Sequence, residues 1–389
     1  MTKTVQLHKD KHMRDARADD KQPIQLDLWQ MYVSETYSNS LALYQSLPDV
    51  YSWKQSRLRN PDGSLPALSR KGKFDQLAYS LDISPAQLTV IEAETNKKIK
   101  KAYYKTLLAE IVEEALHKLS VEEWFFLKQD DVKTEEFGLI TTFYKIRQQL
   151  KRAWKNYSYE QIRQWISILA GLRYELSWDI SKSYGLDSFF SPIDLIIKND
   201  RKNPLHSELY ITFNKLISKK ILAIEWRGFN YYEYMKVKSI LWRRFFMRLC
   251  HRFKQVDAIK GYHILLSTLI EDGDIQEDAL SNCVRDINKA MAECSYIISS
   301  YTLEKKGRVK LESWKTITDY LLTVFPTAEF QQEQWRINTH QKNLKNHRID
   351  QTWKPVIKPL RDQYKTWLDY DRYVDDCDKF EKAVEQTNN

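Results

Sequence analysis

The sequence has little glycine for its length, with 9 glycines in 389 residues. No two of them stand closer than Gly63 and Gly72, so the glycine spacings that let backbone amides surround phosphate groups are absent. This argues against P-loop nucleotide hydrolases, dinucleotide-binding dehydrogenases and protein kinases. We expect the protein to work without a cofactor.

Cysteine and histidine are also sparse. The four cysteines, Cys250, Cys283, Cys294 and Cys377, form no C-x-x-C pair, which argues against a zinc knuckle or a disulfide framework and fits a reducing cytoplasm. The eight histidines include no His-hydrophobic-His pair of the kind that holds the metal of Tyr-nicking nucleases. We therefore expect no metal site.

Long apolar runs are missing as well. The N-terminal stretch mixes charges of both signs without an apolar segment, and no run approaches the ~20 apolar residues of a membrane span. The expected location is the cytoplasm, without membrane insertion.

Aromatic and basic residues are present in quantity. Hydrophobic residues make up 42% of the chain and aromatic residues 13%, enough for packed cores in the two or three domains that this length suggests. Lys and Arg number 61 against 52 Asp and Glu, which gives a net charge of +9. Such an excess indicates a polyanionic partner, either nucleic acid or an anionic membrane surface.

Apolar periodicity predicts a core helix in the first half, from about residue 98 to 119. Two more helices follow, and Ser158 with Gln161 three residues later predicts a capping box at the start of the second. Strand-like runs come next, with a basic loop over 199–207. We expect residues 48–73 to form an irregular connection. The lysines at 97–105 are expected to be the solvent-exposed start of the core helix.

The second half repeats this order. A long helix is predicted over 231–255, then a short helix at 262–270 and a longer one at 276–294. Two strands at 297–303 and 316–325 are expected to flank a basic tip around Gly307.

These elements predict a mainly α fold with small β-hairpins, organised as tandem winged-helix (helix-turn-helix) domains. We expect a charged N-terminal region at 1–73, winged-helix domains at 74–222 and 223–330, and a C-terminal extension at 331–389.

In such domains a helix enters the major groove and a basic hairpin reaches phosphates. The outward face of the 276–294 helix supplies Ser281, Asn282, Arg285 and Lys289, and the second wing supplies Lys305, Lys306, Arg308 and Lys310. In the first half, the corresponding candidates are Lys151, Arg152, Arg163 and Gln164. Each face taken alone also fits an ordinary solvated helix; the repetition of helix and basic wing favours DNA binding.

Three arginines recur every fourth residue on the 231–255 helix: Arg244, Arg248 and Arg252. With no acid nearby in sequence, phosphate contact is slightly favoured over pairing with carboxylates of the same domain or covering apolar surface. Paired carboxylates that bind Mg²⁺ are one interpretation of Asp369, Asp371, Asp375 and Asp376, but a solvated polar segment fits them better.

Several segments resemble plasmid replication initiators of bacteria, the Rep proteins with two winged helices. They are ISPAQL at 83–88, IVEEALHKLS at 111–120, YSYEQIRQWISILAGLRYEL at 157–176 and CVRDINKAMAECSYIISSYTLEKKGR at 283–308. The resemblance covers roughly residues 70 to 330.

The resemblance implies a non-enzymatic protein that binds repeated sites (iterons) in double-stranded plasmid origin DNA. It also implies opening of an adjacent A+T-rich segment, recruitment of host replication proteins, and a possible homodimer. The alternatives are a winged-helix transcriptional repressor without a role in replication, and a DNA-nicking enzyme.

Overall fold

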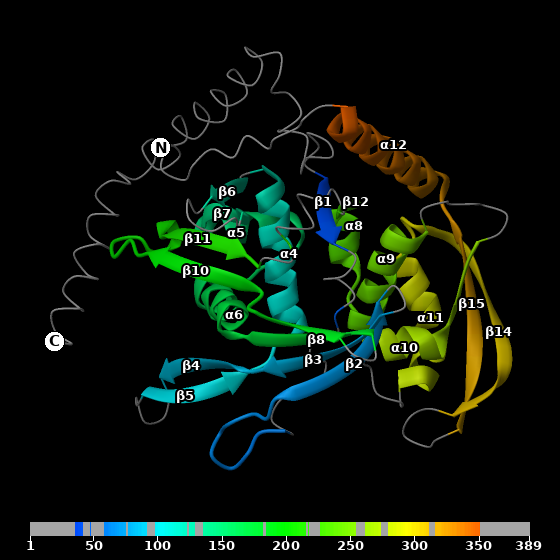
Figure 1. Cartoon of the computed structure of the whole chain (residues 1–389), viewed down its shortest axis with the longest axis horizontal. Helices are drawn as coiled ribbons and strands as arrows, with labels where there is room; N and C mark the ends of the chain where they lie inside the picture. The colour runs from blue at the N-terminus through cyan, green and yellow to red at the C-terminus, as the bar shows by residue number, and fades with distance from the viewer. Residues whose placement is uncertain are drawn as a thin grey trace.

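The computed structural model describes residues 36–41, 47, 58–74, 77–91, 98–122, 124–128, 135–181, 184–214, 217, 226–253, 261–273, 279–310 and 316–350. These residues form five antiparallel sheets, and strand residues are about as numerous as helical ones (Figure 1). The expectation of a mainly α fold is therefore wrong.

Strands that were not predicted from the sequence lie mostly in the first half, where some of them pair with residues 173–181, which begin with a run that was expected to be a strand. One sheet has the order β2-β3-β8-β9, formed by β2 (Leu68–Phe74), β3 (Leu77–Ser84), β8 (Arg173–Ser181) and β9 (Tyr184–Phe190). Leu81 and Ile83 are buried, and they pair in register with Leu176 and Tyr174. This alternation of buried and exposed residues has the period of a strand.

A separate hairpin consists of β4 (Ala86–Ile91) and β5 (Lys98–Tyr103). Its second strand, β5, is formed by residues that were expected to start a helix. The hairpin packs through Ala86 against Gly171, which ends the helix that begins at Tyr159. A Cβ on Gly171 would lie 3.0 Å from the Cβ of Ala86, so glycine permits this close approach. Tertiary packing therefore overrides a lysine-rich sequence with little strand character of its own.

Three helices follow the expected order: α4 (Leu107–Glu122), α5 (Phe143–Arg152) and α6 (Tyr159–Gly171). The capping box of α6 is confirmed. The Gln161 backbone N–H donates to Ser158 Oγ at 3.2 Å, and the Ser158 N–H donates to Gln161 Oε1 at 2.9 Å. Thr142 caps α5 with one hydrogen bond, in which its Oγ1 accepts from the Lys145 N–H.

The second sheet of this half has the order β10-β11-β7-β6. Its strands are β10 (Ile193–Lys198), β11 (Glu208–Phe213), β7 (Glu135–Thr142) and β6 (Trp124–Lys128). The strand-like runs expected on either side of the basic loop at 199–207 are confirmed as β10 and β11, which pair antiparallel. Asp200 orders that loop by accepting from the N–H groups of Lys202 and Asn203.

The second half departs from its predicted helices in two places. The segment expected as one helix is divided into α8 (Tyr231–Lys236) and α9 (Ile240–Arg252). The segment expected as a short helix begins as strand β13 (Tyr262–Leu265) before α10 (Leu266–Gly273). The remaining elements are β1 (Tyr37–Leu41), its partner β12 (Trp226–Asn230), α11 (Ala279–Glu293), β14 (Ile298–Lys310), β15 (Thr316–Pro326) and α12 (Ala328–Asp350).

The expected tandem winged-helix architecture is not evident. The β2-β3-β8-β9 sheet and the β4–β5 hairpin are built into the first half, and β1 from the N-terminal segment pairs with β12 at the start of the second half. The winged-helix order was predicted from local sequence patterns, and these strand pairings join segments that lie far apart in the sequence.

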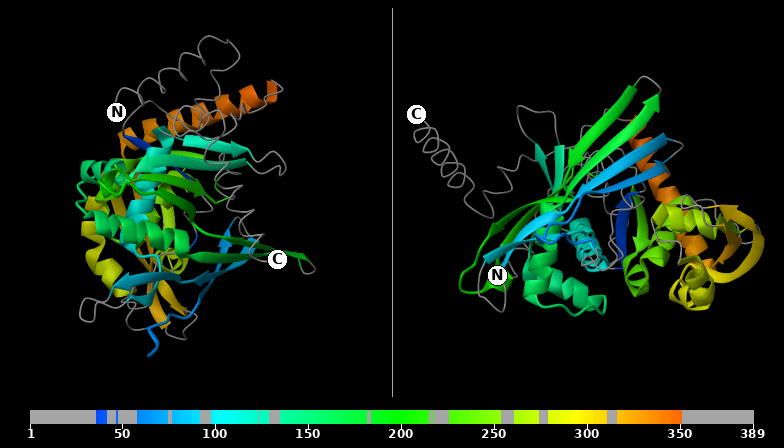
Figure 2. Two further views of the ribbon diagram at one scale, coloured as in Figure 1. Left: turned by 90° about the vertical axis from the view of Figure 1, so that its left-hand side faces the viewer. Right: turned by 90° about the horizontal axis from the view of Figure 1, so that it is seen from below.

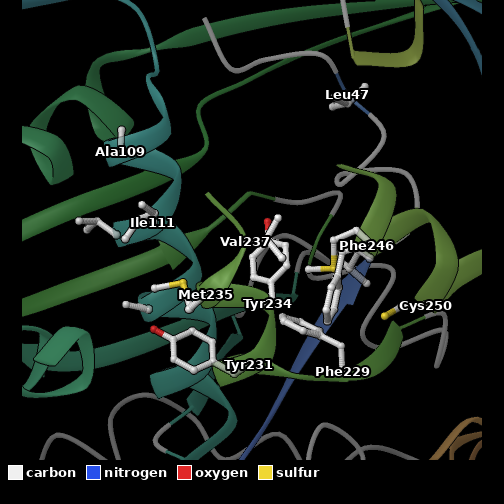
Figure 3. Close-up of a cluster of buried hydrophobic side chains, with 14 of the residues drawn as sticks. Leu47, Ala109, Ile111, Phe229, Tyr231, Tyr234, Met235, Val237, Phe246 and Cys250 are labelled. Carbon is white, nitrogen blue, oxygen red and sulfur yellow. The ribbon is translucent and has the colours of Figure 1, made fainter. Parts of the chain in front are cut away.

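Helix α4 lies between the two halves, with the β10-β11-β7-β6 sheet on one side and β1, α8 and α9 on the other (Figure 1). Figure 3 shows Tyr231 and Met235 of α8 pointing toward α4, and Tyr234 clustering with Phe229 and Phe246. Even the polar side chains of α4 are buried: Glu110, Glu113, Glu114, His117 and Lys118. The two halves thus share one core.

At the opposite edge, β14 and β15 form a long curved ribbon that bounds the second half (Figure 1 and the right-hand view of Figure 2). Among the helices that the structure describes, none is long and apolar enough to cross a membrane. The cysteines Cys250 and Cys294 are free and buried.

Candidate nucleic-acid interface

Helix α11 presents an exposed polar face that includes Arg285 and Lys289. The Arg285 guanidinium contacts Asp286, with Nε donating to Oδ1 at 3.1 Å and Nη2 to Oδ2 at 3.3 Å. Hydrogen bonding to Asp286 raises the pKa of Arg285, and the same contact lowers the pKa of Asp286. A base or phosphate that binds Arg285 through Nε and Nη2 would therefore displace this carboxylate.

Two further candidates, Ser281 and Asn282, lie in α11, but their side chains fall outside the described part of the structure. The opposite face of the helix is buried at Ile287, Ala290 and Met291, and Cys294 is buried directly after its end.

Hydrogen bonds fix the position of α11 relative to the ribbon. The Tyr301 hydroxyl of β14 donates to Oδ1 of Asn288 on α11. Asp319 of β15 is wholly buried, and it accepts from the Ser267 backbone N–H at 3.1 Å and from Ser267 Oγ at 2.5 Å at the start of α10. A carboxylate at a helix N-terminus accepts hydrogen bonds from free backbone N–H groups, and its negative charge interacts favourably with the helix dipole. The ribbon is thus hydrogen-bonded to α11 through β14 and to α10 through β15.

The β14–β15 ribbon carries exposed Lys305 and Lys306, and Lys306 Nζ lies 2.9 Å from Oε2 of Glu304. The expected tip around Gly307 is wrong, because β14 continues through Gly307 to Lys310 and the register shifts between Lys305 and Arg308. The side chains of Arg308 and Lys310 lie outside the described residues. The basic stretch is therefore an edge of the ribbon rather than its turn.

The arginines of α9 have different surroundings. Arg248 Nε donates to the Tyr262 hydroxyl of β13 at 2.8 Å and is half-buried, Arg244 is also half-buried, and only Arg252 of the three is exposed. The structure therefore does not present them as one open stripe.

Sequence reasoning missed Arg243, which is wholly buried. Its Nε lies 3.5 Å from Oε1 of Glu110 on α4, and its guanidinium carbon lies 4.0 Å from the centre of the Tyr234 ring. The absence of nearby acids in sequence was no guide, because Glu110 is 133 residues away.

In the first half, Lys151 and Arg152 are exposed at the end of α5, and Arg163 is exposed on α6. Gln164 is half-buried and hydrogen-bonds Tyr103 of β5, whose pKa is raised by burial despite the opposing charge of Arg59. The β4–β5 hairpin thus covers part of the face expected to be open.

That hairpin itself carries exposed Lys98, Lys100 and Lys101 on β5. Lys105, from the same basic run, is buried instead, with Nζ 2.6 Å from Oε2 of Glu113 on α4. A two-stranded ribbon fits the major groove as a helix does. The run of lysines could have indicated a basic surface here, but the sequence did not predict that these residues form a strand.

Within the residues that the structure describes, no cluster of three or more His, Cys, Asp or Glu side chains could hold a metal ion. No protein-family model matches the chain, and no curated protein matches it significantly.

Solved structures of domains 2 and 3 of RctB are similar to parts of this chain. A selenomethionine derivative has 13% sequence identity and a TM-score of 0.39, covering 70% of this chain and 95% of that one. A second structure of RctB domains 2-3 has 11% identity and a TM-score of 0.40, covering 71% and 97%.

Proposed function

We propose that this chain binds duplex DNA sequence-specifically and initiates replication at repeated plasmid origin sites. The observation that carries the DNA-binding part is the pairing of the exposed face of α11 with the basic β14–β15 ribbon, joined by Tyr301 and Asn288. A helix of this kind fits the major groove, and a basic ribbon beside it reaches phosphates. The net charge of +9 supports a polyanionic partner.

In this proposal Asn282, Arg285 and Lys289 read bases, while Lys305, Lys306 and Arg308 contact phosphates. The first half adds phosphate contacts through Lys151, Arg152 and Arg163, and through the lysines of β5. Phosphate-driven association comes first, and base readout follows.

The replication role rests on the sequence resemblance to Rep proteins. Bending a site costs on the order of a few kcal/mol, so several copies bound side by side would be needed to strain A+T-rich steps. The same resemblance supports recruitment of host replication proteins and a dimer of the free protein, which sedimentation would test.

Footprinting on the native origin tests the proposal. We expect protection of direct repeats spaced by roughly two helical turns, together with single-strand reactivity in a neighbouring A+T-rich tract. Protection of a lone palindrome with no opening would instead support a repressor.

We also propose that the protein has no catalytic step of its own. Incubation of supercoiled origin DNA with the protein and Mg²⁺ tests this. Nicked DNA, or protein covalently attached to DNA, would support the alternative of a nicking enzyme.

A further inference from the structure

Trp154 occupies an unusual position in the turn between α5 and α6. Its φ is 57°, and it is the one non-glycine residue with a positive φ among those the structure describes. Bulky L-residues avoid this region, whereas glycine adopts it without a steric penalty. The side chain is nevertheless 70% exposed, so core packing does not explain why tryptophan stands there.

Contacts from the second half hold the indole in place. Its ring lies at 71° to that of Tyr232, with centroids 6.3 Å apart, and Lys236 Nζ lies 5.8 Å from the centre of the Trp154 ring. Both partners belong to α8. With these two contacts in place Trp154 is still 70% exposed, so most of its surface remains available to a ligand.

Positive charge surrounds this ring. Lys151 and Arg152 are exposed immediately before the turn, Lys236 is exposed at the end of α8, and Lys238 is exposed just after it. Lys155 follows Trp154, and its pKa is lowered first by burial and then by the charges of Arg243 and Lys238. Two carboxylates offset part of this charge: Glu233 lies 2.6 Å from Lys236 Nζ, and Glu293 accepts from the Lys238 backbone N–H at 3.0 Å.

An exposed, fixed aromatic ring among cations is the arrangement that binds an unpaired base and its phosphates. Bases in a duplex are stacked on both sides and offer no free face to such a ring. We propose that Trp154 is a stacking platform for an unpaired nucleotide of a nucleic-acid strand whose phosphates lie along Lys151, Arg152, Lys155 and Lys238. This site shares Lys151 and Arg152 with the proposed duplex-binding surface and adds to it a ring that contacts only an unpaired base.

The test uses the full chain and two variants matched in exposure. Trp154→Gly removes the ring and suits the positive φ, so the fold should be retained, and Trp335→Ala removes a tryptophan of α12 that is 68% exposed. Fluorescence anisotropy would be measured with labelled oligo(dT) and oligo(U) of about 16 nucleotides, and separately with origin duplex.

We expect Trp154→Gly to weaken oligonucleotide binding by at least about fivefold and to leave duplex binding unchanged. Trp335→Ala should change neither. Quenching of tryptophan fluorescence by the oligonucleotide should be present in the wild type and lost in Trp154→Gly. A preference for oligo(dT) or oligo(U) would identify DNA or RNA as the strand, and either supports the site.

Three results would overturn the proposal: no oligonucleotide binding by the wild type, unchanged binding by Trp154→Gly, or competition by polyglutamate as effective as that by oligo(dT). The duplex measurement keeps this outcome separate from the proposed function. A protein that binds oligo(dT) but no duplex would contradict duplex recognition and leave the stacking site supported.

Discussion

Arg243 on α9 and Glu110 on α4 form a fully buried ion pair between the two halves of the molecule, with Nε and Oε1 3.5 Å apart. The Tyr234 hydroxyl also donates to Oε1 of Glu110, at 2.9 Å, while its ring lies against the guanidinium. Burial raises the pKa of Tyr234, which keeps this hydroxyl protonated as a donor. Arg243 and Tyr234 therefore both contact the same carboxylate oxygen of Glu110 in a buried site.

Removing one member of this pair leaves a buried charge without its partner. Arg243→Met is expected to lower the free energy of unfolding by about 3 to 5 kcal/mol. The double variant Arg243→Met with Glu110→Leu should lose less than Arg243→Met alone, because neither charge remains. Urea unfolding of the two single variants and the double variant gives the coupling energy; additive losses would show that the pair is not coupled.

The division of labour between α11 and the ribbon can be tested with one variant in each. Arg285→Ala should cost about 1 to 3 kcal/mol on cognate duplex and relax base preference, whereas Lys306→Ala should weaken binding to all sequences and reduce the salt slope by about one. Anisotropy titrations over a range of salt concentrations, on cognate and random duplexes, measure both effects. Equal losses by both variants on both duplexes would contradict the assignment.

Local patterns predicted the helices that carry their own signals. Ser158 and Gln161 predicted the start of α6. The spacing of the apolar residues Ile287 and Met291 predicted the buried face of α11. The strands β2 to β5 were missed because their pairing partners and the helix they pack on supply most of the information. A lysine-rich segment such as Lys98–Tyr103 has no strong local preference for a strand.

The candidate site was predictable to a similar extent. Exposure of Arg285 and Lys289 follows from their place opposite the apolar face of α11. The contact of Arg285 with Asp286 could be predicted because the two residues are adjacent in the sequence. The burial of Arg243 could not be predicted, because it depends on Glu110 in the other half of the molecule. The conformation of Trp154 has no local sequence signal at all.

Asp319 is expected to position the α10–α11 pair. Asp319→Ala removes a wholly buried carboxylate that accepts two hydrogen bonds from Ser267, each worth about 1.5 to 3 kcal/mol when the acceptor is charged. We expect a clear loss of thermal stability and weaker duplex binding through displacement of α11. Asp319→Asn, which keeps an acceptor, should recover part of both. Thermal unfolding and anisotropy on the same samples check this, and a stable Asp319→Ala variant would contradict it.

Glu333 of α12 should make stability depend on pH. Burial raises its pKa to about 7, Glu329 adds to this, and the Tyr296 hydroxyl and Arg227 oppose it. Because the ordinary value is near 4.5, the folded protein holds a proton that the unfolded chain releases between these two pH values. The stability from this group is therefore complete below about pH 4.5 and is lost as the pH rises through about 7. Glu333→Gln, which stays neutral, should exceed the wild type in unfolding free energy by on the order of 1 to 3 kcal/mol at high pH, with the difference vanishing at low pH. Denaturant unfolding across this range measures it, and parallel profiles for the two proteins would exclude Glu333 as the titrating group.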